Sequence, residues 1–176
     1  MTKDLNAGFT KFSSPDRITC VAFHPSEELF ATGDVIGVIR MWYGLTPARL
    51  KQTSSTREGR AGETSAPTTT LHWHAHAVKS ITFSPNGAYL LSGGEEAVLV
   101  VWQLQTGHKE FIPRIGAPIN SIVVAPTHSD REQEVLVALL DGTIVIITVA
   151  TLKIARIFKE IKSCMLCFQL NDTLTF

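Results

Sequence analysis

The stretch VKSITFSPNGAYLLSGGEEAVLVVW, residues 78–102, decides the fold. Apolar and polar residues alternate up to Phe83, a polar turn follows at 84–87, and two more short apolar runs occupy 88–92 and 98–102. Alternation with a period of two indicates β-strands, and the Pro and Gly of the turn suit the break between two of them. No helical period competes with this pattern.

The pattern is repeated along the chain. Residues 18–42, ITCVAFHPSEELFATGDVIGVIRMW, match residues 78–102 at a constant offset of 60, which relates Phe23 to Phe83 and Trp42 to Trp102. A third copy begins at Ile119 with INSIVVAP, and a fourth begins in SCMLCFQLNDTLTF, residues 163–176. Repetition of this kind predicts a row of similar β-units that pack on one another.

The chain resembles the WD-repeat family in its pitch, its Phe-Ser-Pro-x-Gly turn, its Ser-Gly-Gly run and its strand-ending Trp. The resemblance implies an all-β fold: a partial WD40-type β-propeller of about three blades plus the start of a fourth. The expected divisions are a lead-in at 1–17, blades at 18–75, 76–117 and 118–160, and a truncated start of a further blade at 161–176.

The family's structural tetrad links a His, a Ser or Thr, an Asp and the Trp of one blade. The second unit matches it best, with a structural tetrad of His74, Ser92, Glu96 and Trp102, in which Glu96 stands where Asp is expected. We therefore expect a hydrogen-bonded structural chain in this blade and not a catalytic relay.

The other two units depart from the tetrad. The first keeps Thr32 and Trp42 but has Ile36 at the Asp position and Ser14 at the His position. The third keeps Asp141-Gly142, replaces the Trp with Ile147 and has no His.

Residues at about 44–70 are extra relative to the second unit. They include QTSSTREGRAGETSAPTTT, which has almost no large apolar residue and cannot bury enough surface to offset its ordering entropy. We expect a Ser/Thr-rich mobile insertion between the last two strands of the first blade. Its hydroxyls are either modification sites or, as is commoner, ordinary residues of a tolerated surface loop.

Composition excludes several classes of protein. Sixteen Lys and Arg balance sixteen Asp and Glu, so no overall field attracts nucleic acid or a membrane. Residues 1–17 have no apolar secretory core, and Asp141-Gly142 divides the apolar stretch 135–150 into two strands of a hairpin rather than a membrane span. Three cysteines are too few for a disulfide framework, which favours the nucleus or cytoplasm.

Three groups of residues are candidate chemical sites. Alternate histidines in His72-Trp73-His74-Ala75-His76 share a strand face and could hold a metal, but no cysteine or carboxylate pair completes the site. The Cys164 and Cys167 pair would point to opposite faces of a strand, which favours core packing. The carboxylates Glu95 and Glu96 lie in a turn that is solvated by default. We predict no enzyme activity, no cofactor and no metal.

Three runs carry a narrower resemblance, LHWH at 71–74, LLSGGEEAVLVVW at 90–102 and EFIPRIGAPI at 110–119. They are similar to a WD-repeat subunit of the transcription-linked subcomplex of the small-subunit processome, over about residues 17–150. This implies a non-catalytic scaffold in the nucleolus of the nucleus, which supports pre-rRNA transcription by RNA polymerase I and pre-18S rRNA processing. The implied partners are other WD-repeat subunits and, indirectly, a particle containing pre-rRNA or snoRNA, with no membrane and no small-molecule substrate.

Two alternatives stay open. One is a WD-repeat scaffold of another pathway, such as a ubiquitin-ligase adaptor or a signalling platform, and the other is an enzyme or metal protein built on a propeller. Because closure usually takes four to eight blades, we also expect this chain to be part of a longer protein and to associate with itself when alone.

Overall fold

The computed structural model describes residues 14–44, 67–125 and 133–159, and within them every regular element is a β-strand. The strands form three antiparallel sheets of four strands each. The first sheet contains β1 (Ile18–Phe23), β2 (Leu29–Asp34), β3 (Val38–Tyr43) and β4 (Thr68–His72). The second contains β5 (Val78–Phe83), β6 (Tyr89–Gly94), β7 (Leu99–Gln103) and β8 (Lys109–Ile112). The third contains β9 (Ile119–Val124), β10 (Glu134–Leu139), β11 (Ile144–Thr148) and β12 (Lys153–Phe158).

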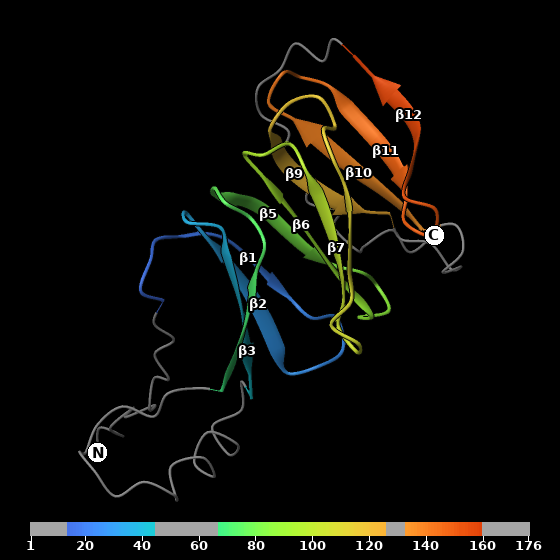
Figure 1. Cartoon of the computed structure of the whole chain (residues 1–176). Coiled ribbons are helices and arrows are strands. Elements are labelled where there is room, and N and C mark those ends of the chain that lie inside the picture. The colour runs from blue at the N-terminus through green and yellow to red at the C-terminus, as the bar shows by residue number, and fades with distance from the viewer. Residues whose placement is uncertain (1–13, 45–66, 126–132, 160–176) are drawn as a thin grey trace, which may run out of the picture.

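The sheets follow one another as layers, coloured from blue through green to orange in Figure 1. Within each sheet the strands lie in chain order, so each is a meander of hairpins. The first strand of each sheet lies beside the first strand of the next, β1 beside β5 and β5 beside β9. This is the radial arrangement of propeller blades, and the prediction of an all-β, partial propeller with about three blades is confirmed.

Two apolar cores hold the layers together. The core between the first and second sheets contains Leu29, Ala31, Ile39, Met41, Val78, Ile81, Phe83, Leu90, Val100 and Trp102. The core between the second and third contains Leu91, Leu99, Val101, Ile112, Ile115, Ile119, Ile122, Val135, Val137, Leu139, Val145 and Ile147. Successive residues of a strand face opposite sides, so β6 gives Leu90 to the first core and Leu91 to the second.

The turns of neighbouring sheets also meet. His24 follows β1, and its Nε2 lies 3.0 Å from the carbonyl oxygen of Gly87 in the β5–β6 turn. Gly87 has φ +72, and a Cβ there would come within 2.4 Å of the His24 ring. Glycine is therefore required both by the backbone conformation and by the close approach of the imidazole.

The Ser/Thr-rich insertion was predicted to reach residue 70, and this end was wrong. Thr68, Thr69 and Thr70 belong to β4 and pair with Trp42, Met41 and Arg40 of β3. Their β-branched side chains suit an extended, solvent-facing outer strand in spite of their polarity.

Several predictions fall partly or wholly outside the described residues. They concern the lead-in at 1–13, the mobility of the insertion at 45–66, and the truncated further blade at 161–176 with its Cys164 and Cys167. The division into blades at 18–75, 76–117 and 118–160 stays a prediction. Among the described segments there is no helix long and apolar enough to cross a membrane.

Candidate functional site: polar networks within the sheets

The second sheet and the connection before it contribute four side chains to one hydrogen-bonded chain, of which only Glu96 is partly exposed. The indole N–H of Trp102 on β7 donates to Ser92 Oγ on β6 at 2.9 Å. Ser92 Oγ lies 2.9 Å from Nε2 of His74, and Nδ1 of His74 lies 3.0 Å from Oε2 of Glu96. The structure thus brings together all four residues that the sequence named for this blade.

The protonation of the chain follows from its geometry and burial. Burial lowers the pKa of His74, against the opposing effect of Glu96. A neutral imidazole donates from Nδ1 to Glu96 and accepts at Nε2 from the Ser92 hydroxyl, whose oxygen accepts from Trp102. Donation therefore runs in one direction, from indole to hydroxyl to imidazole to carboxylate. The contact between His74 and Glu96 is a hydrogen bond and not an ion pair.

Glu96 also holds the segment that enters the second sheet. Its Oε1 accepts from the backbone N–H of Ala75 at 2.5 Å and from that of His76 at 2.6 Å. Burial alone would raise the pKa of Glu96, but the hydrogen bonds from His74, His76 and Ala75 outweigh it and lower the pKa. The longer Glu side chain thus spans from the β6–β7 turn to the β4–β5 connection.

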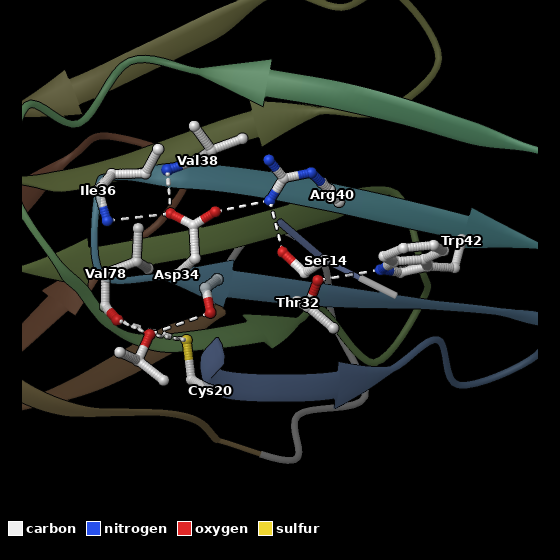
Figure 2. A network of polar contacts seen from close by, with 11 residues as sticks. Ser14, Cys20, Thr32, Asp34, Ile36, Val38, Arg40, Trp42 and Val78 are labelled. Carbon is white, nitrogen blue, oxygen red and sulfur yellow. Dashed lines mark hydrogen bonds and ion pairs between the residues drawn. The ribbon is translucent and has the colours of Figure 1, made fainter. Parts of the chain in front are cut away.

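The first sheet has the same Trp and hydroxyl but a different continuation (Figure 2). Trp42 Nε1 donates to Thr32 Oγ1 at 2.9 Å. Ser14, at the position of His74, has its Oγ 2.9 Å from Nη1 of Arg40, and the same nitrogen lies 2.6 Å from Oδ2 of Asp34. The side chains at and around the tetrad positions of this sheet therefore form two separate groups, a Trp–Thr pair and an Arg–Asp–Ser group.

Asp34 is the acceptor around which the β2–β3 turn forms. Its carboxylate is 1% exposed, and Oδ1 accepts from the backbone N–H of Ile36 at 3.1 Å and of Val38 at 2.9 Å. Together with Arg40, these donors satisfy a charge that would otherwise be costly to bury. Ile36, which stands at the family's Asp position, gives only its backbone to this network and leaves its side chain exposed.

The third sheet has apolar side chains at the positions of the hydroxyl and the tryptophan. Ile147 lies opposite Val135 as Trp102 lies opposite Leu90, so Val137 takes the place of Ser92. Val137 and Ile147 are fully buried in the core shared with the second sheet. Asp141 stays in its turn and accepts from the backbone N–H of Thr143 at 2.9 Å.

Sequence reasoning missed the pair formed by Asp34 and Arg40. These two residues lie outside the family's tetrad positions, and their equivalents in the second unit are Gly94 and Val100. A signal was available, because residues 34 and 40 flank a tight turn and have the even spacing that places both on one face of a hairpin.

The other candidate groups have different settings. In His72-Trp73-His74-Ala75-His76, His72 ends β4 and His76 lies beyond it, both exposed, whereas His74 is buried. Within residues 14–44, 67–125 and 133–159 no three His, Cys, Asp or Glu side chains gather as metal ligands would. Burial raises the pKa of the Cys20 thiol, so this thiol is not activated as a nucleophile. Glu96 is not the solvated turn residue expected by default, because His74 and two backbone amides bind it.

An open groove of about 430 Å³ lies between the second and third sheets. Its polar lining comes from Asn86, Tyr89, Gln103, His108, Glu110 and Gln133. Among these described residues, His108 and Glu110 make an exposed contact of 3.6 Å, and no lining residue is a Ser, Cys or Lys nucleophile. The groove thus shows no nucleophile and base held together.

The chain is similar in sequence to several curated proteins. Human WD repeat-containing protein 75 is 36% identical over 150 residues, which are 81% of this chain and 16% of that protein. U3 small nucleolar RNA-associated protein 17 of Schizosaccharomyces pombe is 51% identical over 55 residues, 31% of this chain and 7% of that protein. The chain thus spans about a sixth of the human relative's length.

Solved structures give the same fold at lower identity. The β-propeller domain of Myceliophteria thermophila Cps50 (Swd1) superposes with a TM-score of 0.60 at 20% identity, over 80% of this chain and 38% of that one. The model of the family "WD repeat-containing protein 75 first beta-propeller" matches residues 7–131. The family match, the repeat in the sequence and the order of the strands in each sheet all indicate a propeller. This chain belongs to the WD repeat-containing protein 75 first β-propeller family.

Proposed function

We propose that the chain is part of a non-catalytic WD-repeat scaffold that acts in ribosome biogenesis. The observation that carries the proposal is the match of residues 7–131 to the WD repeat-containing protein 75 propeller family, with 51% identity to a U3 small nucleolar RNA-associated protein over 55 residues. The finer form of the proposal places it in the transcription-linked subcomplex of the small-subunit processome. There it would support pre-rRNA transcription by RNA polymerase I and pre-18S rRNA processing in the nucleolus.

The polar networks support a structural role for the chemistry-bearing residues. His74 is fully buried, and both its nitrogens are used by Ser92 and Glu96. A general base must reach a substrate proton, and this imidazole has neither exposure nor a free nitrogen. We infer that the tetrad stabilises the blade and that function lies on the rims and loops that a rigid propeller presents.

The charge balance favours protein partners over direct RNA contact. The chain carries sixteen basic and sixteen acidic residues, whereas phosphate binding requires clustered positive charge. We infer that the partners are other WD-repeat subunits, and that pre-rRNA or a snoRNA-containing particle is reached through them.

Affinity purification from nuclear extract tests the proposal. The tagged chain should recover small-subunit processome proteins and U3 snoRNA, and the proteins should stay bound after RNase treatment. A WD-repeat protein of a ubiquitin ligase, tagged identically, is the control for generic propeller binding. Recovery of ubiquitin-ligase or signalling subunits without processome proteins would favour the alternative scaffold and would contradict the proposal.

A further inference from the structure

The open groove between the second and third sheets, which we call the second–third groove, is bounded on both sides by described sheets. One wall comes from the second sheet and its turns, and the other comes from Gln133, Val149 and Ala150 of the third. Its volume of about 430 Å³ lies within the range of ligand-binding clefts. The groove is therefore a feature of the interface between two sheets that the chain itself supplies.

The side chains at this place differ from those at the equivalent place between the first and second sheets. There, Tyr43 and Leu104 pack against the shared core. Gln103 is the equivalent of Tyr43 at the offset of 60, and Val149 is the equivalent of Leu104 in the strand register. An amide thus stands in place of a phenol ring, and a valine in place of a leucine. The smaller side-chain volume at both positions leaves the second–third groove open.

Gln133 gives the groove a polar group that lacks a partner. It is 4% exposed, and its backbone carbonyl accepts from the N–H of Val149 at 2.9 Å. Its side-chain amide makes no hydrogen bond within residues 14–44, 67–125 and 133–159. In the same part of the chain, every side-chain nitrogen or oxygen that is sealed from solvent has a hydrogen bond. The amide of Gln133 therefore opens onto the groove that it lines, where a bound ligand can supply its partner.

Glu110 sets the charge of the groove. It is the only Asp, Glu, Lys or Arg among the described lining residues. It lies opposite Val101 in the pairing of β7 with β8, and opposed residues share a face of the sheet, so Glu110 faces the third sheet as Val101 does. Its contact with Nε2 of His108 is 3.6 Å, which is longer than a hydrogen bond. The groove therefore presents one carboxylate to a cationic ligand.

An apolar strip on β12, the outermost strand of the third sheet, continues this side of the interface (Figure 1). Ile154 lies opposite Ile147 and Ile157 lies opposite Val145, and both partners face the second sheet. Opposed residues share a face, so Ile154 and Ile157 also face the second sheet. They are nevertheless 44% and 52% exposed. Their exposure therefore arises beside a sheet that is present, and a ligand in the groove can cover them.

We propose that the second–third groove binds an extended peptide segment of a partner protein, with an arginine side chain at Glu110 and aliphatic side chains against Ile154 and Ile157. A cation complements the lone carboxylate, and the Gln133 amide offers donors and an acceptor to the backbone of the segment. Arginine suits the site better than lysine, because its planar fork binds a carboxylate through two N–H groups. The proposal rests on the scaffold role proposed above and not on its pathway.

An extended segment places its side chains at the spacing that the groove requires. Alternate residues of a strand-like peptide point the same way, about 6.6 Å apart. An arginine with aliphatic residues two and four positions away therefore directs all three side chains into the groove, while the residues between them face solvent.

Retention of peptide libraries on the immobilised 176-residue chain tests the proposal. One library has arginine with aliphatic residues two and four positions away, a second has glutamate in place of the arginine, and both are made in the two chain directions. We expect the chain to retain the arginine library about ten-fold more than the glutamate library, because like charges in a groove repel. Mass spectrometry of the eluted peptides gives this ratio.

Three variants locate the binding. Glu110→Lys should reverse the ratio, because it replaces the lone carboxylate with a cation. Glu27→Lys, which makes the same change of charge on an exposed turn of the first sheet, is the matched control and should leave the ratio unchanged. Gln103→Tyr with Val149→Leu installs the side chains of the first–second interface and should reduce retention of both libraries to that of a blank matrix. Circular dichroism establishes that each variant is folded.

Several outcomes would overturn the proposal. They are equal retention of the two libraries, a ratio that Glu110→Lys leaves unchanged, and full retention by the variant with Gln103→Tyr and Val149→Leu. Self-association of the chain that Glu110→Lys abolishes would identify a second copy as the occupant and would also overturn it. The assay needs no nuclear extract, so its failure would leave the processome purification to decide the pathway.

Discussion

The first and second sheets place a tryptophan and a hydroxyl in the same geometry and then complete the network in different ways. In the second sheet, the Ser92 hydroxyl is hydrogen-bonded to His74, which lies in the connection between the first and second sheets. In the first sheet, Arg40 and Asp34 are paired within one hairpin, and Ser14 joins them from before β1. The network of the second sheet therefore holds the β4–β5 connection against that sheet, whereas the network of the first sheet mainly stabilises the β2–β3 turn.

The third sheet shows that neither network is needed to make a blade. Val137 and Ile147 occupy the hydroxyl and tryptophan positions and are fully buried. A satisfied polar network and an apolar core are both stable solutions, while a partly satisfied network is worse than either. The third sheet is stable without such a network. Removing one member of an existing network should nevertheless lower the free energy of unfolding, because it leaves buried polar groups without partners.

The largest effect is expected from Ser92→Ala. The substitution removes the acceptor of the Trp102 N–H and the donor to His74 Nε2, both buried. Because two polar groups lose their partner, we expect a loss of about 3 kcal/mol in the free energy of unfolding. Urea denaturation at one fixed protein concentration gives the value. A loss no greater than that of Thr32→Val would mean that the imidazole adds nothing to the second network.

A smaller loss is expected from Arg40→Val, which installs the residue that the second sheet has at this position. Asp34 stays buried without its cation but keeps the N–H groups of Ile36 and Val38, so we expect about 2 kcal/mol. Adding Asp34→Asn should recover part of the loss, because the amide keeps an acceptor oxygen and removes the charge. If the double variant is no more stable than Arg40→Val, an uncompensated charge is not the cause.

Thr32→Val should cost less, about 1 kcal/mol, since it removes one hydroxyl acceptor and keeps the side-chain volume. The comparison with Ser92→Ala measures what the longer chain of the second sheet contributes. Tryptophan fluorescence follows this unfolding, and Thr32→Ser, which keeps the hydroxyl, is the matched control.

The smallest effect is a pH dependence that belongs to the second sheet. The folded pKa of His74 is lowered from 6.5, so its contribution is complete above that value and is lost as the pH falls below it. The folded pKa of Glu96 is lowered from 4.5, so its contribution is complete above 4.5 and is lost as the pH falls through the folded pKa. Both act in one direction. Glu96→Gln should remove the Glu96 part of the dependence below pH 4.5. Because Glu96 opposes the lowering of the His74 pKa, the same change should extend the His74 part to lower pH. An unchanged curve would contradict this assignment.

The sequence predicted the repeated strands and the second network because both depend on local patterns. The offset of 60 carried Phe23 onto Phe83 and Trp42 onto Trp102, and the structure places each pair on equivalent strands. The Arg40–Asp34 pair was missed because these two residues lie outside the positions of the family's tetrad. The Thr68–Thr70 strand was missed because polarity was taken as a sign of a loop, whereas strand pairing with β3 decides the matter.

The ends of the β3–β4 connection are fixed on the same rim. Tyr43 N donates to Pro67 O at 3.1 Å, and Gly44 N donates to Glu28 O at 3.0 Å. With the exits anchored, doubling the length of the chain between them costs only about 0.6 kcal/mol in closure entropy. This connection is therefore a suitable site for inserting a reporter domain or an affinity tag. An insertion between Gly44 and Pro67 should leave the register of β3 against β4 unchanged.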